Sequence, residues 1–132
     1  MAFQFAAAFA ALFATAGNPA VPVQVAAAEM QQAVPLIEPA KLDRLMKANI
    51  RVMLVDVRQP GEFAQGHIDG ATLIPLDTLP TSYQQIPKNV KLVVYCRSGH
   101  RSAQAVEFLR SHGYTRAVSL QGGFLAWSAT PH

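Results

Sequence analysis

The segment VMLVDV, residues 52–57, decides the fold, because it is a nearly continuous apolar run. A strand that is apolar on both faces is typical of a parallel sheet with both sides covered. Similar short runs follow at ATLIP (71–75), KLVVY (91–95) and AVSL (117–120). The sequence therefore predicts an α/β domain, a parallel sheet with helices on both faces.

Helical patterns separate these runs. Residues 38–46 combine a proline in the first turn with leucines spaced for an amphipathic helix. Residues 77–86 and 101–112 can also be helical, and the glycine pair at 122–123 marks a turn into a last amphipathic helix. Ligands of such sheets bind at the carboxyl ends of the strands. Cys96 lies at such an end, directly after the KLVVY run.

The composition excludes several classes of function. The chain has 132 residues, enough for one domain with its own core. Its single cysteine rules out an internal disulfide, and its scattered histidines argue against a structural zinc site, so we expect no metal and no cofactor. A net charge of +3, without a cluster of basic and aromatic residues, argues against nucleic-acid binding.

The second half of the chain is strongly basic. From Lys88 onward the only acidic residue is Glu107, against six basic residues: Lys88, Lys91, Arg97, Arg101, Arg110 and Arg116. This imbalance predicts a positive field that favours a small anionic ligand. The alternative is a solvated basic surface without a ligand.

The N-terminal residues differ from the rest. No charged side chain occurs before Glu29, and residues 1–16 are mainly Ala and Phe and end in an A-x-A triplet, as export signals do. Residues 1–16 are predicted as a signal-like or membrane-associated segment, residues 17–35 as an Ala- and Pro-rich linker, and residues 36–132 as the domain. A cleaved signal predicts a periplasmic or exported protein. An uncleaved segment leaves a membrane-associated or cytoplasmic location open.

The loop CRSGHR, residues 96–101, carries the chemistry. If its backbone N–H groups converge and the next helix points its N-terminus inward, the loop forms an anion site with the Cys96 sulfur at its floor. Gly99 can supply a conformation closed to other residues. The amides, the helix dipole, Arg97 and Arg101 would together favour the reactive thiolate form of Cys96. The alternative is that Cys96 is a small buried core residue.

Three motifs in the same order resemble those of the rhodanese-type sulfurtransferase domain. They are LVDVRQPGEFAQGHIDGATLIP (54–75), VVYCRSGHRS (93–102) and LQGGFLAW (120–127), and the likeness covers about residues 36–130. The resemblance implies a rhodanese-like fold with a central five-stranded, mostly parallel sheet. It also implies a persulfide carried on Cys96.

This resemblance implies a sulfurtransferase that moves a sulfane sulfur through Cys96. The donor would be thiosulfate or a polysulfide, and the acceptor a thiophile such as cyanide or a thiol; either partner could also be a protein. The expected binding residues are those of the loop: Arg97, Ser98, Gly99, His100 and Arg101. One of the two arginines could instead pair with a carboxylate and brace the loop.

Other residues are expected to support the site. Asp56, Arg58 and Glu62 are expected to form buried or half-buried hydrogen bonds that fix the surrounding loops. Ser102 follows the loop, and Trp127 is expected at the border of its pocket. His67 and Asp69 are predicted to fix a turn between two glycines.

Three alternatives remain open from sequence. A persulfide carrier that exchanges sulfur with another protein would use the same Cys96. A non-catalytic rhodanese-like module would bind a partner, although such modules typically lack the loop cysteine. A phosphatase or arsenate reductase is a minor alternative, because only four residues separate Cys96 from Arg101 and the related phosphatases have five.

Overall fold

Five strands form one sheet in the order β1-β5-β4-β2-β3, and every neighbouring pair is parallel. This computed structural model describes residues 34–132. The strands are β1 (Leu36–Ile37), β2 (Met53–Asp56), β3 (Thr72–Leu73), β4 (Leu92–Tyr95) and β5 (Ala117–Leu120). The predicted α/β class and the five-stranded parallel sheet are confirmed.

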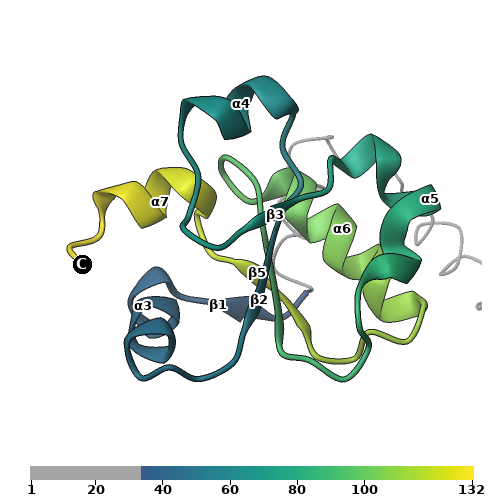
Figure 1. Ribbon diagram of the computed structural model, residues 1–132, viewed down its shortest axis with the longest axis horizontal. Helices are drawn as coiled ribbons and strands as arrows, with labels where there is room; N and C mark the ends of the chain where they lie inside the picture. Colours follow the sequence, from purple (N-terminus) through teal and green to yellow (C-terminus); the bar gives the residue numbers. More distant parts are fainter. Residues whose placement is uncertain (1–33) are drawn as a thin grey trace, which may run out of the picture.

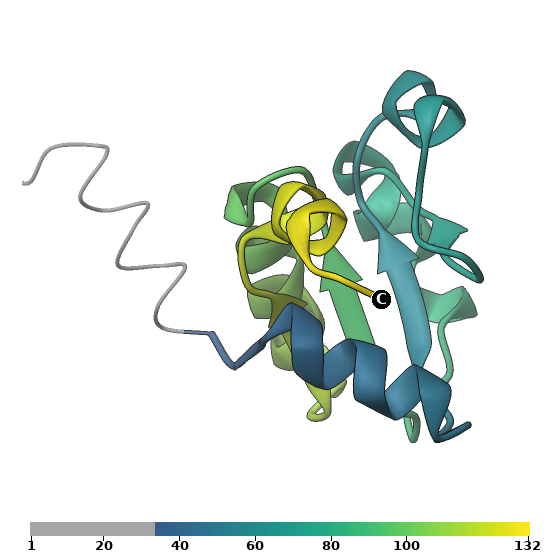
Figure 2. The same ribbon diagram turned by 90° about the vertical axis from the view of Figure 1, so that its left-hand side faces the viewer.

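Helices cover both faces of the sheet. They are α3 (Pro39–Lys47), α4 (Pro60–Gln65), α5 (Leu79–Ser82), α6 (His100–Ser111) and α7 (Gly123–Ala129), with 3₁₀ turns η1 (Leu76–Thr78) and η2 (Tyr83–Gln85) beside α5. Figure 1 shows α3 and α7 on one side of the sheet and α5 and α6 on the other. In Figure 2, α7 lies toward the end of the sheet to which the strand arrows point. The last helix therefore starts at the edge where ligands of parallel sheets bind.

The segment predicted as one helix over 77–86 is instead a series of short turns, η1, α5 and η2. Pro80, which has no backbone N–H, lies in the first turn of α5, so the preceding turn cannot continue through it as a regular helix. At the other end, Pro87 disfavours helical backbone at Ile86, which is extended.

The core consists of two apolar layers, one on each face of the sheet. On the α5 and α6 side, Val55, Val94 and Leu109 are fully buried together with Cys96. On the α3 and α7 side, Leu42, Val93 and Tyr95 form the second layer. Adjacent residues of β4 thus enter opposite layers, as the alternation of a strand requires.

Val34 and Pro35, which precede the predicted boundary at residue 36, contact the domain. Val34 is buried in the core, and the carbonyl of Pro35 accepts a hydrogen bond from the Ser119 N–H at 2.9 Å. The signal-like segment 1–16 and the remainder of the predicted linker lie outside the described residues. Within residues 34–132, no helix has both the length and the apolarity needed to span a membrane.

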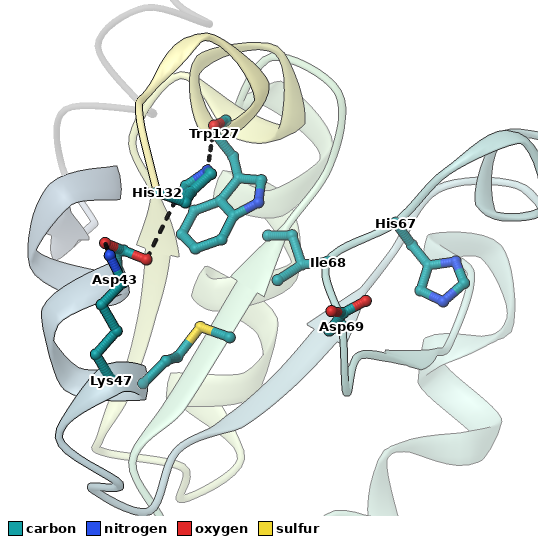
Figure 3. A pocket seen from close by; sticks show the side chains of 8 residues that line it. Asp43, Lys47, His67, Ile68, Asp69, Trp127 and His132 are labelled. Atoms are coloured by element: carbon teal, nitrogen blue, oxygen red, sulfur yellow. Dashed lines mark hydrogen bonds and ion pairs between the residues drawn. The ribbon is translucent and has the colours of Figure 1, made fainter.

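A cavity of about 370 Å³ lies between α3, α7 and the loop before β3. Figure 3 shows Trp127 and Ile68 facing it, with Asp43 of α3 at one side. His132 closes one end, with Nδ1 at 3.2 Å from Asp43 Oδ1 and Nε2 at 2.9 Å from the Trp127 carbonyl oxygen. Cys96 does not line this cavity.

Candidate active site

Cys96 stands where the central strand β4 ends and the loop to α6 begins. Only 1% of its surface is exposed, and its Sγ accepts a hydrogen bond from the Gly99 N–H at 3.0 Å. Gly99 has φ of +115°, a left-handed conformation that glycine adopts without strain. The glycine therefore turns the loop so that a backbone N–H points back at the sulfur.

Two buried hydroxyl groups lie below the sulfur. Cys96 Sγ is 3.5 Å from Ser102 Oγ, which also donates to the Gly99 carbonyl at 3.2 Å. Ser102 Oγ is in turn 2.8 Å from Ser119 Oγ on β5. Ser102 was expected at the site from the sequence, whereas Ser119 was not. The sequence feature that could have indicated Ser119 is a serine within the otherwise apolar run AVSL.

The N-terminus of α7 holds the other side of the loop. The N–H groups of Phe124 and Leu125 donate to the carbonyls of Cys96 and Arg97 at 2.8 and 3.0 Å. A Cβ on Gly123 would lie 2.5 Å from the Arg97 carbonyl oxygen, so only glycine allows this approach. These two loop carbonyls are thus turned toward α7 and away from the sulfur. The glycine pair predicts a turn, but nothing in the sequence indicates this contact.

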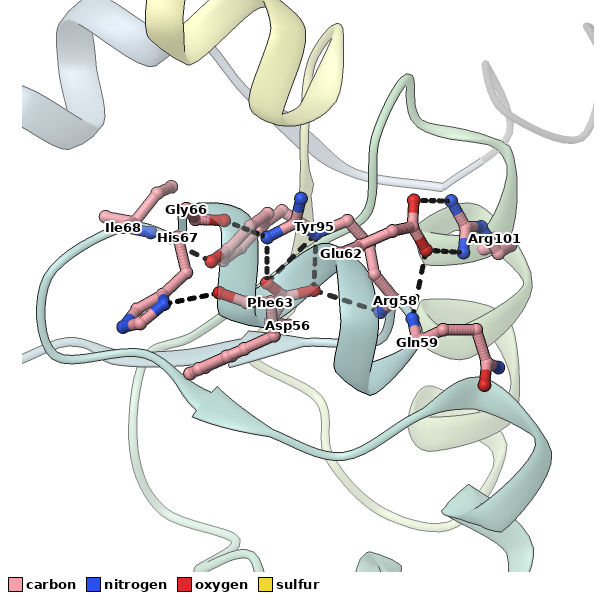
Figure 4. Close-up of polar contacts among 10 residues, drawn as sticks. All are labelled: Asp56, Arg58, Gln59, Glu62, Phe63, Gly66, His67, Ile68, Tyr95 and Arg101. Carbon is pink, nitrogen blue, oxygen red and sulfur yellow. Dashed lines mark hydrogen bonds and ion pairs between the residues drawn. The ribbon is translucent and has the colours of Figure 1, made fainter.

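Arg101 is held by a carboxylate rather than left free for a ligand. Its Nη1 and Nη2 donate to the two oxygens of Glu62 at 2.8 and 3.0 Å (Figure 4). Glu62 also accepts the Gln59 N–H at 3.0 Å, which caps α4. The Arg101 guanidinium, together with that N–H, lowers the pKa of Glu62 to about 2. Of the two loop arginines, Arg101 is therefore the one that pairs with a carboxylate.

A second, fully buried ion pair lies at the end of β2. Arg58 Nη2 is 2.7 Å from Asp56 Oδ2, and Arg58 also donates to the Gly66 carbonyl at 2.7 Å (Figure 4). The Arg58 guanidinium lies 4.6 Å from the centre of the Phe124 ring. Asp56 and Arg58 thus link β2, the loop after α4 and the start of α7. Burial raises the pKa of Tyr95, whose hydroxyl accepts the Ile68 N–H at 3.0 Å.

The remaining loop side chains face solvent. Arg97, Ser98 and His100 are exposed, and Arg97 makes no ion pair within residues 34–132. Beside the loop lies a cavity of about 230 Å³, lined by Arg58, Glu62, Gln65, Gly66, Arg97, Phe124 and Leu125. Trp127 is absent from this lining and belongs to the larger cavity instead. The start of α7, not its middle, meets the cysteine loop, so Trp127 and Arg97 line different cavities.

The turn before β3 is fixed by one of the two predicted residues. His67 Nδ1 donates to the Phe63 carbonyl at 2.9 Å, and its ring stacks on that of Phe63. Asp69 is exposed and lines the larger cavity. In the part of the chain that the structure describes, no three His, Cys, Asp or Glu side chains are grouped as metal ligands.

This arrangement suits a nucleophile that carries a small group. The sulfur has one N–H donor at 3.0 Å, a nearby hydroxyl, and no carboxylate among its hydrogen-bond partners. Arg101 follows in the first turn of α6 and gives two hydrogen bonds to Glu62.

Comparison with known proteins identifies the group to which this site belongs. The rhodanese-like domain family matches residues 38–130. A protein named sulfurtransferase from Allochromatium vinosum is 47% identical over 77 residues, which are 58% of this chain and 72% of that protein. The thiosulfate sulfurtransferase GlpE of Tolumonas auensis is 40% identical over 76 residues, 58% of this chain and 72% of that one.

A solved structure gives the same result. The human single-domain sulfurtransferase TSTD1 has a TM-score of 0.66 and 30% identity, with 76% of this chain and all of that chain covered. The relatives support a sulfurtransferase activity in general. From the family match and the shared fold, we conclude that the chain belongs to the rhodanese-like domain family.

Proposed function

We propose that the protein moves a sulfane sulfur from thiosulfate or a polysulfide, through a persulfide on Cys96, to a thiophilic acceptor such as cyanide or a thiol. The observation that carries this proposal is the position of Sγ, at the floor of a loop whose Gly99 N–H points at it from 3.0 Å. The name of the Tolumonas relative, a thiosulfate sulfurtransferase, supports thiosulfate as the donor.

The reaction has two halves. The Cys96 thiolate attacks the outer sulfur of thiosulfate and forms a new S–S bond, while the S–S bond of thiosulfate breaks and its electron pair leaves with sulfite. The acceptor nucleophile then attacks the outer sulfur of the persulfide, and the Cys96 thiolate leaves. Sulfite is a stable anion, so no general acid is needed to release it.

The loop arginines have different roles in this proposal. Arg97 is exposed, has no ion pair within residues 34–132 and lines the cavity beside the loop, so it is placed to bind the anionic oxygens of the donor. Arg101 is occupied by Glu62 and holds the loop against α4. Ser98 and His100, both exposed, complete the rim that a donor or acceptor meets.

The minor alternative, a phosphatase or arsenate reductase, is disfavoured by the length of the loop. Four residues separate Cys96 from Arg101 here, one fewer than in the related phosphatases. The persulfide carrier uses the same Cys96 chemistry with a protein as donor. Turnover measured with thiosulfate, with polysulfide and with a protein persulfide separates the carrier from the enzyme.

The direct test is the intact mass of the purified protein after incubation with thiosulfate. We expect a gain of about 32 Da, one sulfur, that a reductant removes and that the Cys96→Ser variant lacks, as covalent catalysis requires. Because Cys96 is the only cysteine, no other thiol can account for the gain. A folded protein that gains no sulfur from thiosulfate or from polysulfide would exclude the proposed reaction.

A further inference from the structure

Ser119 places a hydroxyl group in a layer that is otherwise apolar. It lies on β5, beside Val94 of β4, and shares its face of the sheet with Ala117 and the buried side of α6. None of its surface is exposed. A buried hydroxyl at a position that suits an apolar side chain calls for an explanation. Its partner is Ser102, which is also fully buried and which contacts the nucleophile.

Counting protons fixes the direction of these hydrogen bonds. Ser102 Oγ has one proton and three polar neighbours: Cys96 Sγ at 3.5 Å, the Gly99 carbonyl at 3.2 Å and Ser119 Oγ at 2.8 Å. Within residues 34–132, Ser102 Oγ is the only hydrogen-bond partner of Ser119 Oγ. The Ser119 proton therefore points at Ser102, and the Ser102 proton stays free for the carbonyl or for the sulfur.

The carbonyl can give up this bond at little cost. The Ala103 N–H also donates to the Gly99 carbonyl, at 3.1 Å, so that oxygen keeps a donor when Ser102 turns away. In the thiol form, Cys96 donates to Ser102 Oγ. In the thiolate form the sulfur has no proton to give, and the Ser102 hydroxyl can donate to it instead. Hydrogen bonds in such a chain strengthen one another.

We infer that Ser119 is a positioning residue for Cys96: its hydroxyl directs the Ser102 hydroxyl toward the sulfur when the sulfur is anionic. This inference rests on the proposed role of Cys96 as the nucleophile. Together with the Gly99 N–H, the chain from Ser119 through Ser102 gives the thiolate a second donor, from beneath the loop. The side of the loop where Arg97 lies, and which the sulfur donor would meet, takes no part in this chain of hydrogen bonds.

The test is the rate at which Cys96 reacts with iodoacetamide as a function of pH. Alkylation consumes the thiolate and needs no sulfur donor, and the chain has no other cysteine to compete. Ser119→Ala removes the hydroxyl. Ser119→Thr and Ser119→Val form a pair of the same shape that differ in the hydroxyl, and they decide the question if the alanine variant does not fold. Ile86→Val, a loss of one buried methyl group in the same core layer, is the control for general destabilisation.

We expect the Ala and Val variants to be alkylated about threefold to tenfold more slowly at neutral pH, the cost of a weakened hydrogen bond to a charged group. At high pH, the alkylation rates of the Ala and Val variants should converge with that of the unmodified protein. The Thr variant keeps the hydroxyl donor, so its rate should stay within about twofold of the unmodified protein's at every pH. Ile86→Val should have no effect.

Three results would overturn the inference: no change in Ser119→Ala and Ser119→Val, an equal slowing at every pH, or the same shift in Ile86→Val. An equal slowing would mean altered access to the sulfur rather than a less stable thiolate. The proposed function is tested separately by sulfur loading. A protein that shows the Ser119 effect but gains no sulfur from any donor would retain the inference and lose the function.

Discussion

Replacing Glu62 with glutamine should destabilise the protein at neutral pH and should matter less in acid. In the folded chain the pKa of Glu62 falls from its ordinary value of 4.5 to about 2, chiefly because Arg101 donates two hydrogen bonds to it. In full, such a lowering of the pKa corresponds to about 3 kcal/mol. Both side chains are about a third exposed, with 34% for Arg101 and 32% for Glu62, so solvent screens the pair. We therefore expect Glu62→Gln to cost about 1–2 kcal/mol.

The pH dependence gives the sharper test. A carboxylate whose folded pKa is depressed stabilises the protein fully above its unfolded pKa, and this stabilisation is lost as the pH falls toward the folded value. The difference in unfolding free energy between the two proteins, measured by urea titration, should thus be constant above about pH 5.5 and shrink below about pH 4.5. Glu107→Gln is the matched control, because Glu107 is an exposed acid on α6 without an ion pair within residues 34–132. The reasoning would be refuted if Glu62→Gln and Glu107→Gln lost the same unfolding free energy at neutral pH. It would also be refuted if the difference in unfolding free energy between Glu62→Gln and the unmodified protein persisted unchanged in acid.

Three further predictions concern the loop, its support and the N-terminal segment. Arg97→Ala should raise KM for thiosulfate about fivefold, as expected for the loss of an exposed charge contact. In the same steady-state assay, Arg116→Ala, at the opposite end of the sheet, should leave KM unchanged. Gly123→Ala should cost about 2–4 kcal/mol in thermal or urea unfolding and abolish sulfur loading, because its Cβ would meet the Arg97 carbonyl at 2.5 Å. Gly61→Ala, with open space around it, should fold normally. If residues 1–16 are an export signal, the intact mass of protein purified from its native host will lack them; a full-length soluble protein would contradict this.

The fold was largely predictable because its strands are short apolar runs with helical patterns between them. β2, β4 and β5 fall within the runs identified from sequence. β1 and α4 were not predicted from the residue pattern, because two residues of strand and six of helix are too short to show a period. Of the predicted run 71–75, only two residues form a strand, β3, which lies at the sheet edge and pairs with β2 alone.

The candidate site was predictable only as far as it is local in sequence. Cys96, the left-handed Gly99 and the basic loop are contiguous, so their chemistry could be read from one motif. The choice between Arg97 and Arg101 depended on where Glu62 lies, and only the tertiary fold brings Glu62 of α4 to Arg101 of α6, 39 positions along the chain. Backbone donors such as the Phe124 N–H have no signature in side-chain composition. Local motifs thus point to the candidate nucleophile, and tertiary structure supplies the contacts that hold it.

The contact between α7 and the cysteine loop has a consequence for the order of folding. The loop carbonyls of Cys96 and Arg97 receive their donors from α7, the last helix in the described chain, which follows β5 in the sequence. Contacts between segments so distant in sequence form late, because the intervening chain must be ordered first. During synthesis on the ribosome, a chain that has emerged only as far as α6 holds its cysteine without the hydrogen bonds that shape the loop. The set of hydrogen bonds around Cys96 is therefore complete only once α7 has docked.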